Sequence, residues 1–146
     1  CGMEIITSIQ IQASPEKVWS VLTDYNSYGE WNSFIKSIKG EVAVDQVIEA
    51  HVCPPESNEM TFKPVVLVFD ENKELRWRGK LLFSGIFDGE HRFVLRANED
   101  GSTEFIHAEK FSGILVPFMK KMLNGPTKNG FVQMNEALKK KVESLS

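Results

Sequence analysis

The sequence predicts an α+β fold in which a curved antiparallel sheet of seven strands is covered by one long C-terminal helix. Two observations lead to this prediction. Much of the chain up to residue 113 alternates apolar and polar residues with period two, which is typical of strands with one buried face. From Ile114 to Ser146 the apolar residues recur at helical spacing instead. A sheet with one apolar face needs a cover, and only this last helix is long enough to provide it.

The N-terminal part predicts one strand followed by two short helices. Residues Glu4 to Gln12 alternate isoleucine or threonine with polar residues, so we expect a strand there. Ser14 is a suitable N-cap and Pro15 suits the first helical position, so a short helix follows the strand. A second short helix is expected between Tyr25 and Trp31.

Four strands joined by short turns come next. They are expected at residues 38–44, 47–53, 60–69 and 75–82. The turn between the last two places Val66 opposite Trp77 and Val68 opposite Leu75.

A final hairpin is expected between residues 91 and 111, because two alternating segments flank a loop in which Gly101 suits the left-handed position. Its register places His91 opposite Glu109, with His107 on the same face. Ionisable groups are costly inside a solid apolar core unless they are paired. We therefore interpret this face of the hairpin as the wall of a cavity.

The helical tail supports the same interpretation. Asn124-Gly125-Pro126 is expected to kink or break the helix. A single helix is about 10–12 Å wide with its side chains, which is too narrow to fill the hollow of a strongly bent sheet. The arrangement predicts a void, and a void lined by aromatic and methionine side chains suits an apolar ligand.

Composition excludes several classes of function. A net charge of −3 gives no reason to expect nucleic acid as a partner, and no apolar run approaches the length of a membrane span. With only two cysteines, Cys1 and Cys53, neither a disulfide framework nor a cysteine metal site is expected, which favours a reducing cytoplasm. Cys1-Gly2 ahead of Met3 is interpreted as an expression remnant, so we expect one domain over residues 3–146, as a monomer or homodimer.

Six segments in order resemble the START-like, or SRPBCC, superfamily, and in particular its bacterial branch of polyketide cyclase/dehydrase-like proteins. They are SPEKVWSVLTDYNSYGEWNSF (14–34), MTFKPVVL (60–67), ELRWRG (74–79), GIFDGEHRF (85–93), EKFSGILVP (109–117) and GFVQMNEAL (130–138). The resemblance implies a helix-grip fold over nearly the whole chain. Ser33 stands where many relatives are expected to have proline. The superfamily includes enzymes, carriers and regulators, so the resemblance alone does not choose among these functions.

The candidate site combines apolar side chains with one polar pair. The residues expected to bind a ligand are Trp31, Phe34, Phe62, Trp77, His91, Phe93, His107, Glu109, Phe111, Phe118, Met122, Phe131 and Met134. His91 and Glu109 are the candidates for proton chemistry. Two alternatives stay open: the pair only holds two strands in register, or the strand parity is inverted and both face solvent. Three histidines without converging partners predict no metal, and we expect no cofactor.

Three functional hypotheses follow. The first is a binding protein that holds a hydrophobic or amphipathic small molecule, lipid or polyketide-like, between the sheet and the C-terminal helix. The loop at Pro54-Pro55 and the break at Gly125-Pro126 would then form the entrance. The second is a cofactor-independent polyketide cyclase or dehydratase in which His91 takes a proton α to a carbonyl and Glu109 tunes it. The third is a protein-interaction module with an empty cavity.

Overall fold

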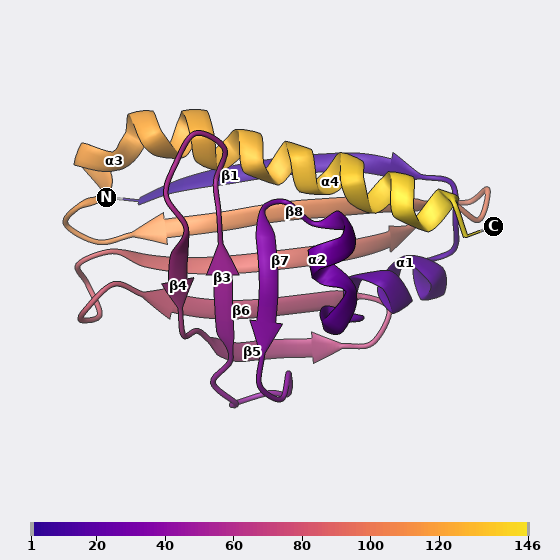
Figure 1. Ribbon diagram of the computed structural model, residues 1–146, viewed down its shortest axis with the longest axis horizontal. Helices are drawn as coiled ribbons and strands as arrows, with labels where there is room; N and C mark the ends of the chain where they lie inside the picture. Colours follow the sequence, from indigo (N-terminus) through magenta and orange to yellow (C-terminus); the bar gives the residue numbers. More distant parts are fainter. Residues whose placement is uncertain (1, 146) are drawn as a thin grey trace.

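A computed structural model describes residues 2–145 and places a long C-terminal helical segment against two antiparallel sheets (Figure 1). Cys1 and Ser146, at the ends of the expected remnant and domain, lie outside the described residues. The strands are β1 (Gly2–Ile11), β2 (Ile35–Lys39), β3 (Glu49–Val52), β4 (Met60–Phe62), β5 (Val65–Asp70), β6 (Glu74–Lys80), β7 (Asp88–Ala97) and β8 (Thr103–Ser112). The helical elements are α1 (Pro15–Leu22), η1 (Tyr25–Ser27), α2 (Tyr28–Trp31), α3 (Val116–Met122), η2 (Leu123–Thr127) and α4 (Lys128–Glu143).

The larger sheet has five strands in the order β1-β8-β7-β6-β5, and the smaller has three in the order β2-β3-β4. An isolated bridge between Val47 and Val65 connects the two. In Figure 1 the strands of the smaller sheet run across the direction of the larger sheet. The predicted cover is confirmed, because α4 packs on β1 and β8.

The expected strand from residue 60 to 69 is wrong in one respect: it is divided into β4 and β5, which belong to different sheets. Pro64 lies between them and has no N–H to donate to a neighbouring strand. The chain therefore leaves one sheet and enters the other at this point. Eight strands replace the predicted seven within the described residues.

Two further boundaries differ from the prediction. The strand expected at residues 38–44 begins earlier and ends at Lys39, where Gly40 turns the chain with a φ of 100°. Across the β5–β6 turn, the pairing of Val66 with Trp77 is confirmed, but Leu75 pairs with Phe69 rather than with Val68. An irregularity between Val66 and Val68 shifts the register by one residue.

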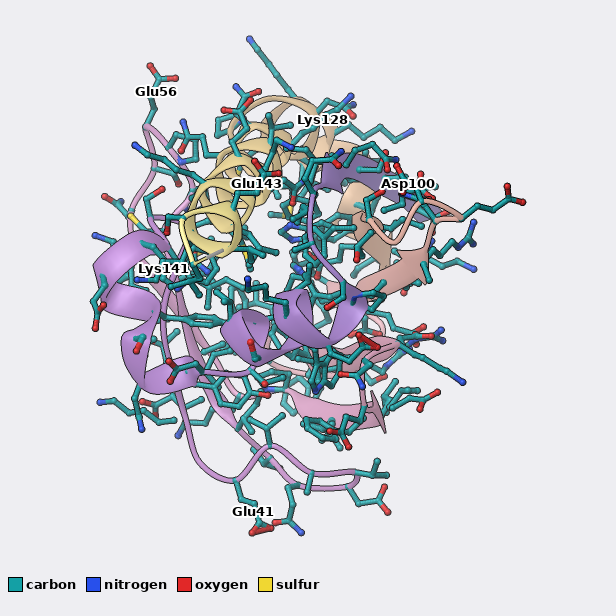
Figure 2. All side chains as sticks on the ribbon, turned by 90° about the vertical axis from the view of Figure 1, so that its right-hand side faces the viewer. Glu41, Glu56, Asp100, Lys128, Lys141 and Glu143 are labelled. Atoms are coloured by element: carbon teal, nitrogen blue, oxygen red, sulfur yellow. The ribbon has the colours of Figure 1, made fainter. Side chains whose placement is uncertain are left out.

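The hairpin that carries the candidate site has the predicted register. Strands β7 and β8 pair His91 with Glu109 and Phe93 with His107. Their inward face packs against α4, and its large side chains, including Phe93 and Phe105, are fully buried. Figure 2, which looks along α4, shows side chains crowding the space between this helix and the strands, with Glu41 and Glu56 pointing outward.

The C-terminal segment stays helical through the expected break. Residues Leu123–Thr127 form a π-helical turn between α3 and α4, with Pro126 inside it. A π turn changes the local hydrogen-bond pattern, which accommodates a residue that has no N–H. The segment is therefore continuous but irregular at the position where it passes the cavity.

Candidate functional site

A cavity of about 130 Å³ lies between the two sheets and the helical segment around η2. Its walls come from β3 and β4 on one side, from β6, β7 and β8 on the other, and from α3 and η2 at the end. Nearly all of the lining side chains are apolar. The full lining consists of Phe34, Ile35, Ala50, Val52, Pro54, Met60, Phe62, Pro64, Trp77, Gly79, Lys80, Leu81, Phe87, Gly89, His91, Glu109, Phe111, Met119, Met122, Leu123 and Thr127.

About half of the residues expected to contact a ligand lie on this wall. They are Phe34, Phe62, Trp77, His91, Glu109, Phe111 and Met122. They come from elements far apart in the chain, which the fold brings together around one space. Their role toward a ligand stays a prediction.

The other expected residues lie elsewhere. Phe93, His107, Phe131 and Met134 are fully buried in the core beside the cavity, and Trp31 is half-buried on α2, away from the lining. Phe118 is 85% exposed, so its expected place in the cavity is wrong. Helix α3 begins at Val116 and directs Met119 and Met122 inward, which turns Phe118 to the surface.

Several lining residues were not expected from the sequence. Met119 belongs to the same apolar stripe as Met122 and was within reach of sequence reasoning. Ala50 and Val52 alternate on one face of β3, but nothing local indicates that this face meets the larger sheet. Gly89 has no side chain, so the apolar pattern gives no reason to expect it in the lining.

Gly89 makes room for the carboxyl group of Glu109. A Cβ atom at position 89 would overlap Oε2 of Glu109 and approach its carboxyl carbon to 3.2 Å. The neighbouring strand can therefore carry the carboxyl group directly above the backbone of β7. This close approach places Glu109 at the cavity wall.

The polar pair is part of a longer chain of hydrogen bonds. Nδ1 of His91 lies 3.0 Å from Oε1 of Glu109, and Nε2 of His91 lies 2.7 Å from Nε2 of His107. Nδ1 of His107 lies 2.9 Å from Oδ1 of Asn135 on α4. The amide nitrogen of Asn135 donates to Oγ1 of Thr7 on β1, at 2.8 Å. These hydrogen bonds therefore link the cavity wall to β1, the strand beneath α4.

His91 and Glu109 both line the cavity, so the alternative in which this pair faces solvent is wrong. His91 is 5% exposed and His107 is completely buried. Burial lowers the pKa of His107 well below its usual range, and the nearby His91 acts in the same direction. Phe131 stacks on the His107 ring with centroids 4.1 Å apart, and Trp77 stacks on His91 with centroids 5.4 Å apart. His107 is therefore held as a neutral imidazole between aromatic rings.

The third histidine belongs to a different place. His51 on β3 lies beside Glu49 and Glu59, with nitrogen–oxygen distances of 2.8 and 3.4 Å. Among residues 2–145 there is no group of three histidine, cysteine or carboxylate side chains arranged to hold a metal ion.

Comparison with known proteins agrees with this architecture. The family model described as "Polyketide cyclase / dehydrase and lipid transport" matches residues 3–143. The chain belongs to this family. The resemblance to START-like proteins and the helix-grip fold are thereby confirmed. No curated protein matches the sequence.

Solved structures of similar fold cover nearly the whole chain of this polyketide cyclase/dehydrase family member. Protein MLL2253 from Mesorhizobium loti has a TM-score of 0.73 at 20% identity, covering 99% of both chains. The ZhuI aromatase/cyclase from Streptomyces sp. R1128 has a TM-score of 0.74 at 16% identity, covering 98% of this chain and 94% of its own. A START superfamily protein from Mycobacterium smegmatis has a TM-score of 0.72 at 22% identity, covering 98% and 99%. At these identities the similarity concerns the fold.

Within residues 2–145, no helix is both long and apolar enough to cross a membrane.

Proposed function

We propose that this chain binds a hydrophobic or amphipathic small molecule, lipid or polyketide-like, in the cavity between the sheets and the C-terminal helical segment. The observation that supports it most is the composition of the wall, in which aromatic, aliphatic and methionine side chains surround one carboxyl–imidazole pair. Apolar burial of about 25 cal/mol per Å² supplies the affinity of such a site, and a few polar groups supply orientation. The description of the family, polyketide cyclase / dehydrase and lipid transport, is consistent with a ligand of this kind.

The size of the cavity limits what fits without movement. About 130 Å³ is comparable with the roughly 150 Å³ cavities that take up benzene. Typical ligand sites of about 300–1,000 Å³ are larger, so a lipid or a multi-ring polyketide requires the wall to open. The loop at Pro54-Pro55 and the π turn are the proposed moving parts, because Pro54, Leu123 and Thr127 line the cavity from these segments.

Filling the cavity tests the proposal. Ala50 is buried on the wall, so we expect Ala50→Leu to occupy the space and to weaken binding of an environment-sensitive apolar dye at least about tenfold. Ala97→Leu, at an exposed end of β7, is the matched control and should bind as the unchanged protein does. Binding is measured by dye fluorescence. Equal affinity in both variants contradicts the proposed site.

The natural ligand is sought by native mass spectrometry of protein purified gently from its own host. A co-purified lipid or polyketide-like mass supports the carrier. No added mass together with no dye binding contradicts it and favours a protein-interaction module with an empty cavity.

A second candidate function is a cofactor-independent polyketide cyclase or dehydratase. It is favoured by one observation, the 3.0 Å contact between His91 and Glu109 at the wall of an apolar cavity. The test is turnover of a model poly-β-ketone by the unchanged protein and by His91→Ala. Turnover that is lost in the variant supports the enzyme. Turnover that survives excludes proton chemistry by this pair.

We infer one domain over residues 3–146, acting as a monomer or homodimer. A reducing cytoplasm is the proposed compartment, supported by a free thiol at Cys53.

A further inference from the structure

The direction of each hydrogen bond in the buried polar chain follows from its deep end. Oγ1 of Thr7 lies 2.7 Å from the backbone carbonyl oxygen of His107. A carbonyl oxygen only accepts, so the hydroxyl proton of Thr7 points to it. The Thr7 oxygen must then accept from Asn135, which assigns the amide nitrogen of Asn135 to this contact at 2.8 Å. The amide oxygen consequently faces His107.

The tautomers of both histidines are determined by this orientation. Nδ1 of His107 donates to the amide oxygen of Asn135 at 2.9 Å. His107 is completely buried and neutral, so its Nε2 carries a lone pair. Nε2 of His91, at 2.7 Å from that lone pair, must therefore carry a proton.

One proton is then shared at the cavity end of the chain. Nδ1 of His91 and Oε1 of Glu109 are 3.0 Å apart, and a hydrogen bond between them needs one proton. It lies either on His91, which makes an imidazolium–carboxylate pair, or on Oε1 of Glu109, which makes a neutral pair. A carboxylate facing the lone pair of a neutral His91 has no hydrogen bond and is repulsive.

The same geometry decides which group a ligand can reach. Both ring nitrogens of His91 are occupied, one by Glu109 and one by His107. Among the described residues, Oε2 of Glu109 has no hydrogen-bond partner, and the Glu109 side chain is 18% exposed at the cavity wall. In either position of the shared proton, Oε2 is a hydrogen-bond acceptor. Glu109 is thus the polar contact, and His91 is a positioning residue.

We propose that Glu109 selects ligands that present a hydroxyl group, such as a phenol or an enol, on an apolar ring. This inference rests on the proposed function, because it requires that the cavity binds an apolar molecule. A hydroxyl donates to Oε2, whereas a methyl group in the same place leaves the oxygen without a partner. The cavity volume of about 130 Å³ suits a single ring of this kind.

The experiment compares phenol with toluene, which exchange a hydroxyl for a methyl group of similar size. The dissociation constants of both probes are measured by calorimetry or NMR titration for the unchanged protein, Glu109→Leu and Glu109→Gln. The quantity of interest is the ratio of the toluene constant to the phenol constant, because differences in hydration between the probes cancel between variants.

We expect this ratio to fall about tenfold in Glu109→Leu, which removes the acceptor. Glu109→Gln should keep the ratio within about twofold, since its amide nitrogen donates to Nδ1 of His91 and its oxygen takes the place of Oε2. A ratio that is the same in the unchanged protein and in Glu109→Leu overturns the inference while the proposed function stands. Failure of both probes to bind the unchanged protein contradicts the proposed function itself.

A measurement on the unchanged protein tests the assigned direction of the hydrogen bonds without any variant. Long-range proton–nitrogen NMR spectra distinguish histidine tautomers. We expect His107 to be protonated only at Nδ1 and His91 to be protonated at Nε2. A proton on Nε2 of His107 contradicts the assigned direction of the hydrogen bonds; Oε2 of Glu109 stays an acceptor in that case, and the probe ratio alone decides its role.

Discussion

His107 is the residue whose chemistry burial changes most clearly. It lies between β1, β7 and α4, stacked on Phe131, with its Nδ1 proton held by Asn135. Desolvation favours the neutral ring because a charged imidazole gains less from this environment than from water. The core therefore tolerates an imidazole only in one protonation state and one tautomer.

This state makes stability depend on pH. In the unfolded chain His107 titrates near the ordinary histidine value of 6.5, whereas its folded pKa lies well below it. As the pH falls below about 6.5, the unfolded chain takes up a proton that the folded chain does not. The free energy of unfolding therefore decreases, by up to about 1.4 kcal/mol per pH unit, until the folded pKa is reached.

Urea unfolding at pH 7, 6 and 5 measures this effect. His107→Gln should show a smaller decrease over the same interval, although it is less stable at pH 7. Three carboxyl groups have lowered pKa values, those of Glu49, Asp100 and Glu143. They change the free energy of unfolding only at lower pH, since their ordinary pKa values are 4.5 or less. The same slope in His107→Gln and the unchanged protein would contradict the assignment to His107.

At the scale of elements, the docking of α4 depends on a glycine where the helix passes closest to Phe34. A Cβ atom at position 130 would lie 2.6 Å from Cε1 of Phe34, far inside a normal contact. The close approach lets Phe34 pack edge-on against Phe131, with ring centroids 5.4 Å apart. Phe34 also lines the cavity, so the position of α4 and the shape of the cavity are linked.

Gly130→Ala is therefore expected to destabilise the protein by about 1–3 kcal/mol, although alanine alone favours a helix by about 1 kcal/mol. The matched control is Gly29→Ala in α2, where an added Cβ meets open space and should be neutral or stabilising. Adding Phe34→Leu to Gly130→Ala should recover part of the loss. Thermal or denaturant unfolding provides the measurement, and equal effects at the two glycines would contradict this account.

At the scale of the whole molecule, rigidity is unevenly distributed around the cavity. Strands β7 and β8 are paired with each other along their full length, β8 is paired with β1 along its full length, and β7 is paired with β6 from Asp88 to Val94. The opposite wall is built from short strands, the loop at residues 54–59 and the π turn, which contain fewer ladder hydrogen bonds. Opening for a larger ligand is consequently expected on that side.

Amide hydrogen exchange tests this expectation. Without ligand, residues 54–59 and 123–127 should exchange faster than the centres of β7 and β8. A bound apolar ligand should slow exchange in those two segments and leave β8 unchanged. Ligand protection confined to β8 would place the entrance elsewhere.

Local patterns were sufficient for a large part of this protein. Alternation with period two, together with Gly101 in the loop, predicted the β7–β8 register, because side chains of paired strands have no freedom once the turn is known. The facing of His91 and Glu109 follows from that register alone. Asn135 was missed because it lies on α4, and no local signal relates the rotation of a helix to a particular residue of a strand. Phe118 was misplaced for the same reason.

The sequence by itself determined the order of elements, the sheet-and-helix architecture and the pairing of the imidazole with the carboxyl group, since these depend on neighbours in the chain or across one turn. Tertiary structure alone decided the division of the strands into two sheets, the size of the cavity and the direction of the buried hydrogen bonds from Thr7 to Glu109. These depend on contacts between distant segments, such as that of Thr7 with Asn135, 128 residues along the chain, whose geometry is set only when α4 docks on the sheet.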